Sequence, residues 1–510
     1  MRFLVPVLMM MLFSPVRAGE TDWEGVHNAT VRGINYLYNL EMDRALMTFD
    51  SVTVMAPGDP RGRFFRSMVH FWTFSLRNQD EDFDQFMTYS DSVIVLCQAL
   101  IDRNDEDAVS LFYLGGIRGY RGLAYQMRGS LLDAVMEGRS GYLSLEEAVH
   151  LRPDMSDAHM GFGLFRYLVA KIPSGLSWVT GLLGFEGDLE GGLRSLRYAA
   201  DHGVYTRSEA TLYLSQFLRR EGMKEEAEER LEGLIRKHPD NTLFLVLKAN
   251  WAYRDNRIDE ALELLGRAEE INERTSIRHG EEFIYSTRGA IAYRKNNFAL
   301  ARKEFDRFLN GTTLQSRVPN ITYYRIAVAR DIGGDREGAV DACRLMRDDE
   351  ESFRRQNGAF FYRKGMELAF APLTAAQQLH IRGENARARG ALDSAVIYYD
   401  KALQERSADD DVRALCFYGL QETAFDQEEY DKTVTLGNSI VSLHPLRERW
   451  VQPYAYLKSA RALRLLGQLD EAEAALDAAS EFDDFDFQDS FERSLDRELE
   501  DLERRRDQIQ

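Results

Sequence analysis

SEATLYLSQFLRREGMKEEAEERLEGLIRKHPDN (residues 208–241) is followed directly by TLFLVLKANWAYRDNRIDEALELLGRAEEINERT (residues 242–275), and the second stretch repeats the pattern of the first. Ala227 aligns with Ala261, and Leu231 aligns with Leu265, 34 positions later. Small residues at such positions let two helices touch closely, and the large ones fill the space beside them. A period of 34 is typical of solenoids built from antiparallel helix pairs. We therefore predict an all-α fold, an α-solenoid of stacked helix pairs.

The composition agrees with a helical, folded protein. Only 11 of the 510 residues are proline, and 44% are hydrophobic, which is ample for a continuous core. The formal net charge is −19. Since a nucleic-acid binder needs a basic surface, this charge argues against nucleic acid as the partner. The three cysteines, Cys97, Cys343 and Cys416, are widely spaced and odd in number, so we expect buried thiols and no disulfide framework.

The first 18 residues have the pattern of a secretory signal peptide. Arg2 supplies the positive charge, residues 3–13 form an apolar run, and Val16-Arg17-Ala18 matches a cleavage site. No later stretch approaches the roughly 18 apolar residues of a membrane-spanning helix. We therefore expect an exported protein, periplasmic or extracellular and soluble after cleavage, with no direct membrane span.

The pattern also predicts how the chain is organised. After the signal peptide, residues 19–203 hold one standard repeat followed by longer, aromatic-rich helix pairs. Residues 204–348 and 349–480 hold further repeats, and an aromatic helix at residues 353–370 falls outside the repeat count. Residues 481–510 are acidic, yet apolar residues recur there at helical spacing, so we expect a capping helix that shields the last core.

Several repeats resemble the tetratricopeptide repeat. The first of them, at residues 26–59, has Gly33 and Tyr36 on its first helix and Ala45 and Phe49 on its second, and Pro57 ends it. Looser copies have their small and aromatic positions at Gly289, Ala301, Phe305, Gly383, Ala395, Tyr399, Ala460, Ala472 and Leu476. The resemblance implies an open concave face lined by the first helix of each pair.

Another segment carries a narrower resemblance. Residues 172–188, IPSGLSWVTGLLGFEGD, are followed by Gly192-Leu193. This order of a proline, an amphipathic stretch, a Gly-Phe-x-Gly-Asp turn and a Gly-Leu pair is similar to the inclusion-body-clearance and TPR-39-type family. The resemblance covers roughly the first 240 residues and implies a shared helical architecture.

The chain lacks the motifs that would indicate catalysis or a cofactor. The glycine-rich segment 172–192 has no Gly-Lys-Ser/Thr ending, so it is not a phosphate-binding loop. His150 and His159, with Asp154 and Asp157 between them, form the nearest approach to a metal cluster, but they lie on both sides of Pro153. No Gly-x-Ser-x-Gly elbow occurs. We expect no enzyme activity, no cofactor and no metal.

The resemblance to tetratricopeptide repeats places a set of side chains on the concave face. These candidate groove residues are Arg219, Arg220, Asn250, Tyr253, Arg254, Tyr293 and Arg294. Arg220, Arg254 and Arg294 occupy equivalent positions, and a basic, aromatic row would bind an acidic peptide or a C-terminal carboxylate. The lysine of the family's carboxylate clamp is replaced by Leu212, Val246 and Ser286. Alternatively, the arginines pair with acidic residues of adjacent helices and hold the stack together.

Three functional hypotheses follow. The first is an exported, non-enzymatic scaffold that binds a protein or peptide partner through its groove. The second is an accessory component of an outer-membrane or polysaccharide export or assembly system. The third, from another class, is a small-ligand binder or enzyme that uses residues 172–192.

Overall fold

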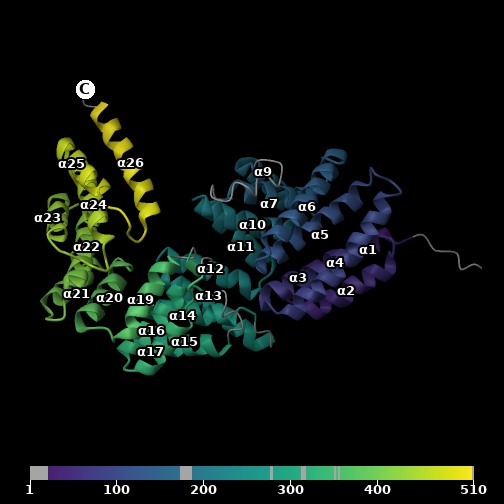
Figure 1. Cartoon of the computed structure of the whole chain (residues 1–510). Coiled ribbons are helices and arrows are strands. Elements are labelled where there is room, and N and C mark those ends of the chain that lie inside the picture. Colours follow the sequence, from purple (N-terminus) through teal and green to yellow (C-terminus); the bar gives the residue numbers. More distant parts are fainter. Residues whose placement is uncertain are drawn as a thin grey trace, which may run out of the picture. The chain divides into compact units, whose positions relative to one another are not determined.

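The computed structural model describes residues 21–172, 187–275, 279–311, 318–349, 352–353 and 357–507. The described residues form twenty-four helices and no strand (Figure 1). The chain divides into two compact units, Met1–Phe244 and Leu245–Gln510. The predicted signal peptide lies outside the described residues. None of the described helices is both long and apolar enough to cross a membrane.

The first unit consists of helices that pair in chain order. The pairs are α1 with α2, α3 with α4, α5 with α6, α7 with α9, and α10 with α11. Their bounds are α1 Trp23–Tyr38, α2 Met42–Met55, α3 Arg61–Arg77, α4 Asp80–Ile101, α5 Ala108–Met127, α6 Leu131–Leu151, α7 Ala158–Ala170, α9 Leu189–His202, α10 Arg207–Arg220 and α11 Lys224–Lys237. Helices α4, α5 and α6 have 22, 20 and 21 residues, whereas α10 and α11 of a standard repeat have 14 each.

The second unit continues the same architecture. Its helices are α12 Thr242–Arg254, which begins in the first unit, α13 Ile258–Thr275, α14 Glu281–Arg294, α15 Phe298–Gly311, α16 Asn320–Ile332, α17 Arg336–Arg344, α19 Gly358–Phe370, α20 Ala375–Arg387, α21 Leu392–Gln404, α22 Asp410–Asp426, α23 Tyr430–Val441, α24 Val451–Leu466, α25 Leu469–Ser480 and α26 Gln488–Asp507. Helix α19, outside the repeat count, packs on α16 and α17. The predicted α-solenoid of helix pairs is confirmed.

A small residue on the first helix and an aromatic ring on the second hold several pairs together. Gly33 faces Phe49, and Gly289 faces Phe305, in both cases 16 positions apart in the sequence. A Cβ atom at either glycine would lie less than 3.0 Å from the facing ring. Because no side chain fits there, the two helices approach closely enough to bury the ring completely, and Phe49 and Phe305 are both fully buried.

The turns inside the pairs share a backbone feature. A residue with positive φ stands between the two helices of most pairs. It is glycine in the α5–α6, α10–α11, α16–α17, α20–α21 and α24–α25 turns, at Gly129, Gly222, Gly334, Gly390 and Gly467. Glycine adopts this left-handed conformation without a steric penalty, and it ends one helix so that the next can run back beside it.

Helix α26 closes the second unit. The helix lies beside α24 and α25 (Figure 1). Phe491, Leu495 and Leu502 on one of its faces are buried against a cluster from α24 and α25 that includes Leu457 and Leu476. The outer face carries the charges, and Arg506 pairs at its far end with Asp470 and Glu473 of α25. The helix therefore covers apolar surface that the last helix pair would otherwise expose.

Candidate peptide-binding groove in the second unit

The second unit contains a groove with a cavity volume of about 680 Å³. Its helical lining comes from α12, α14, α16, α20 and α22, which are first helices of their pairs, and from α19. The lining is completed by residues between helices: 371–374, Ala388, Asp409, Arg447, Glu448, Trp450 and Phe487. Nine aromatic side chains line the groove: Tyr253, Tyr293, Tyr324, Phe360, Phe361, Phe370, Tyr418, Trp450 and Phe487. The groove thus has the helices that a tetratricopeptide-type concave face requires.

Three of the predicted groove residues come together at one part of this lining. The Arg294 guanidinium lies over the Tyr253 ring, 3.9 Å from its centre, and donates a hydrogen bond to the Tyr253 carbonyl oxygen at 2.9 Å. Tyr293 packs edge-on against Phe298. The backbone carbonyl of Tyr293 accepts a hydrogen bond from Asn385 on α20. These contacts fix the Arg294 side chain against an aromatic wall.

The charged groups nearest to Arg294 in its described surroundings are cations. The Arg325 guanidinium lies 6.0 Å from the centre of the Tyr293 ring, and Arg389 donates a hydrogen bond to the Arg294 carbonyl oxygen. Burial lowers the pKa of Arg294, and the positive charges of Arg325 and Arg389 lower it further. Among the described residues, no carboxylate oxygen lies within 4.0 Å of Arg294 or Arg325. We call these two residues the arginine pair.

The other charged side chains of the groove are already paired. Lys364 contacts Glu367 and Glu448, and Arg387 contacts Glu384 and Glu422. Arg447 binds both Asp409 and Asp411. Each of the five carboxylates in the lining forms an ion pair with a lysine or arginine. Among the described residues, no carboxylate forms an ion pair with the arginine pair. In a protein of net charge −19, this part of the groove is therefore a local excess of positive charge.

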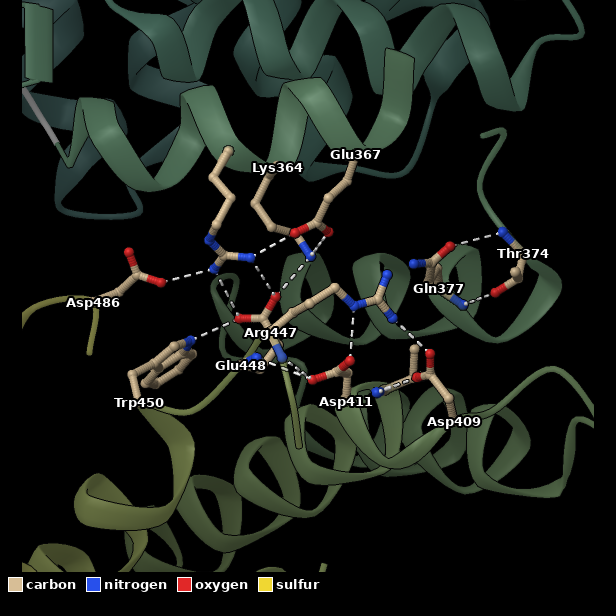
Figure 2. A network of polar contacts seen from close by, with 12 residues as sticks. Lys364, Glu367, Thr374, Gln377, Asp409, Asp411, Arg447, Glu448, Trp450 and Asp486 are labelled. Carbon is tan, nitrogen blue, oxygen red and sulfur yellow. Dashed lines mark hydrogen bonds and ion pairs between the residues drawn. The ribbon is translucent and has the colours of Figure 1, made fainter. Parts of the chain in front are cut away.

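Glu448 is the centre of a network that holds the groove wall in place (Figure 2). Its side chain is 1% exposed and accepts hydrogen bonds from Lys364 Nζ at 2.9 Å and from Trp450 Nε1 at 2.8 Å. Arg363 contacts the same carboxylate and also Asp486. Although burial opposes ionisation, Lys364 and Arg363 hold the pKa of Glu448 at about 2. The ionised carboxylate ties α19 to the segment before α24.

The remaining predicted residues lie elsewhere. Asn250 donates to the Val246 carbonyl and accepts from Thr287 on α14, so its amide joins α12 to α14. Arg254 is exposed at the end of α12, outside the groove lining.

Arg219 and Arg220 belong to the first unit. Arg219 pairs with Glu228 at 3.4 Å, as the alternative hypothesis of stack-holding ion pairs expects, and Arg220 is exposed.

The other candidate sites also have structural contacts. Asp157 Oδ1 accepts hydrogen bonds from the backbone N–H groups of Val204, Tyr205 and Thr206, and His159 contacts the Pro153 carbonyl. In the part of the chain that the structure describes, no three potential metal ligands gather. Most of the glycine-rich segment 172–192 lies outside the described residues.

The helix pairs and their concave lining define a tetratricopeptide-type helical-repeat protein, a class that generally binds protein partners. Residues 154–317 match the family model described as Iml2/Tetratricopeptide repeat protein 39, and this range includes the segment that carried the sequence resemblance. Both resemblances, to tetratricopeptide repeats and to this family, are thereby confirmed.

A curated relative and two solved structures are similar to this chain. The inclusion body clearance protein iml2 of Aspergillus niger is 23% identical over 303 residues, which cover 55% of this chain and 41% of the relative. The matched region is thus less than half of that protein. Yeast Tom70 is 12% identical, with a TM-score of 0.32, covering 91% of this chain and 100% of the other. A tetratricopeptide repeat protein from Parabacteroides merdae is 12% identical, with a TM-score of 0.25, covering 57% and 98%.

Proposed function

We propose that this protein is a non-enzymatic scaffold that binds an acidic segment or a C-terminal carboxylate of a partner protein in the groove of the second unit. The observation that carries the proposal is the arginine pair, Arg294 and Arg325, which has no carboxylate partner among the described residues of an acidic chain. A carboxylate from a partner would complete it.

The chemistry of the groove supports a peptide ligand. Guanidinium groups bind carboxylates through two parallel hydrogen bonds, and such charge-assisted bonds are about twice as strong as neutral ones. The aromatic lining offers apolar contact on either side of the pair. Phe370 also lines the groove and is 93% exposed, so its ring is available for apolar contact with a bound peptide. Together these features fit a peptide that combines acidic and apolar side chains.

A direct test measures the fluorescence anisotropy of a labelled Asp/Glu-rich peptide with one phenylalanine and a free C-terminal carboxylate. Its C-terminal amide and a version with lysine in place of the acidic residues serve as comparison peptides. We expect Arg294→Ala and Arg325→Ala each to weaken binding roughly tenfold or more, since a hydrogen bond to a charged group contributes about 1.5–3 kcal/mol.

Arg254→Ala is the matched control, because Arg254 is exposed on the same helix as Tyr253 but does not line the groove. Its affinity for the peptide should equal that of the unsubstituted protein. Equal binding of the lysine peptide, or unchanged affinity in both groove variants, would contradict the proposal. Stronger binding of the free carboxylate than of the amide would favour a C-terminal ligand over an internal acidic segment.

We further propose that the protein acts outside the cytoplasm, supported by the charge, apolar run and cleavage pattern of residues 1–18. N-terminal sequencing of the protein from fractionated cells should find a mature chain that begins at Gly19 in the exported fraction. An uncleaved chain in the cytoplasmic fraction would reject export. A membrane machine among the proteins that co-purify from envelope fractions would favour the role in an export or assembly system.

A further inference from the structure

The first unit contains a buried carboxylate with one unsatisfied oxygen. Glu209 on α10 is 5% exposed. Tyr38 and Tyr120 both donate their hydroxyl hydrogens to the same oxygen, Oε2, at 3.1 and 2.5 Å. Among the described residues, no group donates to the other oxygen, Oε1, and no cation forms an ion pair with Glu209. A buried polar atom left in this state costs about 1–3 kcal/mol, or more when it is charged.

A cavity of about 80 Å³ adjoins this carboxylate, and Glu209, Tyr38 and Tyr120 are part of its lining. The rest of the lining is mostly apolar and comes from α1, α3, α5, α6 and α7. Its other polar members are Tyr142, Asp157, Tyr205 and Thr206. Glycines form part of one wall. At Gly119 on α5, an added Cβ atom would meet no other atom within 4 Å, so open space lies beside it. A cavity of this volume exceeds the roughly 10–15 Å³ needed for one water and is smaller than the roughly 150 Å³ that holds benzene.

The chemistry of the walls selects the ligand. The free oxygen requires a hydrogen-bond donor, because an ionised carboxylate is only an acceptor. The missing countercharge requires a cation, and the rings of Tyr38, Tyr120 and Phe64 offer faces on which a cation is stabilised. The apolar remainder accommodates a narrow aliphatic body. A primary ammonium group on a short alkyl chain has all three properties.

We propose that the first unit binds a small aliphatic primary amine in this cavity, with the ammonium group donating to Glu209 Oε1 and pairing with its charge. The site is separate from the groove of the second unit and does not depend on the proposed peptide binding. Gly119 leaves room for the alkyl chain, and Tyr38 and Tyr120 hold the carboxylate in position.

Amine binding should depend on pH. Burial raises the pKa of Glu209 to about 7, while the hydrogen bonds from Tyr120 and Tyr38 oppose that rise. Burial raises the pKa values of Tyr38, Tyr120 and Tyr213 well above 10, so these neighbours stay neutral. His238, directly after α11, lies beside Tyr38, and burial lowers its pKa to about 4, so it is also neutral at pH 6–8. The other carboxylate in the lining, Asp157, accepts hydrogen bonds from the backbone N–H groups of residues 204–206. We therefore assign the pH dependence to Glu209, and the amine should bind more tightly at pH 8 than at pH 6.

The test is isothermal titration calorimetry of the full chain with n-propylamine, 1-propanol and propanoate, all smaller than benzene. We expect propylamine to bind at least tenfold more tightly than the alcohol at pH 8, more weakly at pH 6, and propanoate not to bind. Glu209→Gln should reduce amine affinity at least tenfold. Gly119→Leu should do the same by filling the cavity, whereas Gly119→Ala, with space for its methyl group, should change affinity less than threefold.

Circular dichroism shows whether each variant is folded. If Glu209→Gln does not fold, the comparison of Gly119→Leu with Gly119→Ala still tests whether the amine occupies the cavity. No amine binding at pH 8, equal binding of propylamine and propanol, or unchanged affinity in Gly119→Leu would each overturn the proposal.

Discussion

Replacing Glu448 with glutamine removes the charge at the centre of the network in Figure 2 while keeping the shape of the side chain. Lys364 and Arg363 lower the pKa of Glu448 from 4.5 to about 2. At roughly 1.36 kcal/mol per pKa unit, this difference corresponds to about 3 kcal/mol of folding free energy at pH 7. We therefore expect Glu448→Gln to lower the free energy of unfolding by about 3 kcal/mol, since Glu448 is almost fully buried and little screened by solvent.

The sign of the pH dependence follows from the lowered pKa. A carboxyl group with a depressed folded-state pKa stabilises the protein fully above pH 4.5 and loses that effect as the pH falls toward 2. The difference between the two proteins should therefore shrink through this range. Urea unfolding, followed by circular dichroism and by tryptophan fluorescence, measures both quantities. The slope exceeds the roughly 1–3 kcal/mol/M of small proteins in a unit of this size, so at pH 7 the midpoint should fall by about 1 M urea or less.

Glu429→Gln is the matched control. Glu429 pairs with Lys432, but both side chains are about half exposed, and such pairs contribute about 0–1 kcal/mol. Glu448→Gln could lower the free energy of unfolding no more than Glu429→Gln does, or by the same amount at pH 2.5 as at pH 7. Either result would show that the ionised Glu448 does not stabilise the groove wall.

Three more predictions follow from single contacts. Gly289→Ala should lower stability by about 1–3 kcal/mol in urea unfolding, because the new methyl group meets Phe305, whereas Gly119→Ala should slightly raise it. Phe491→Ala should lower the free energy of unfolding by about 3–5 kcal/mol and make α26 the first site of limited proteolysis. If this variant resists proteolysis as well as the unsubstituted protein does, α26 does not act as a cap. Because burial lowers the pKa of His238 to about 4, the unfolded chain binds a proton that the folded chain refuses between pH 6.5 and 4. Stability should thus fall as the pH drops through that range, and His238→Gln should reduce this loss as measured by urea midpoints.

The repeat pattern predicted the fold because each pair depends on a few residues at fixed spacing. Gly33 with Phe49 and Gly289 with Phe305 are visible in the sequence, and they are the contacts that set the distance between helices. The apolar spacing of the last segment similarly predicted the buried face of α26. Local sequence patterns thus predicted both the class of fold and the buried face of α26.

The groove was only partly predictable. Tyr253, Tyr293 and Arg294 follow from the repeat positions, and they do line the groove. Arg325 was missed, because an arginine gives no sequence signal of whether a carboxylate will face it. Trp450 was missed because it lies between α23 and α24, where the repeat pattern assigns no position. Arg325 and Trp450 line the groove because of tertiary contacts, and the spacing of residues along one helix does not predict such contacts.

The buried carboxylate of the first unit could not be predicted from the sequence, also because it depends on tertiary contacts. Glu209 stands in the first turn of a helical stretch, where a glutamate usually faces solvent. Its burial depends on Tyr38 and Tyr120, which are 171 and 89 positions away in the sequence. Only the stacked structure brings the three side chains together.

Photo-cross-linking in the source cells tests the central claim most directly. A photoreactive phenylalanine analogue at Phe370, exposed in the groove lining, should capture a partner protein through an acidic segment. The same analogue at Ile397, exposed on α21 and outside the lining, should not. Combining the Phe370 probe with Arg294→Glu and Arg325→Glu should abolish the cross-link. Capture that is equal from Ile397, or unaffected by the two charge reversals, would contradict the account.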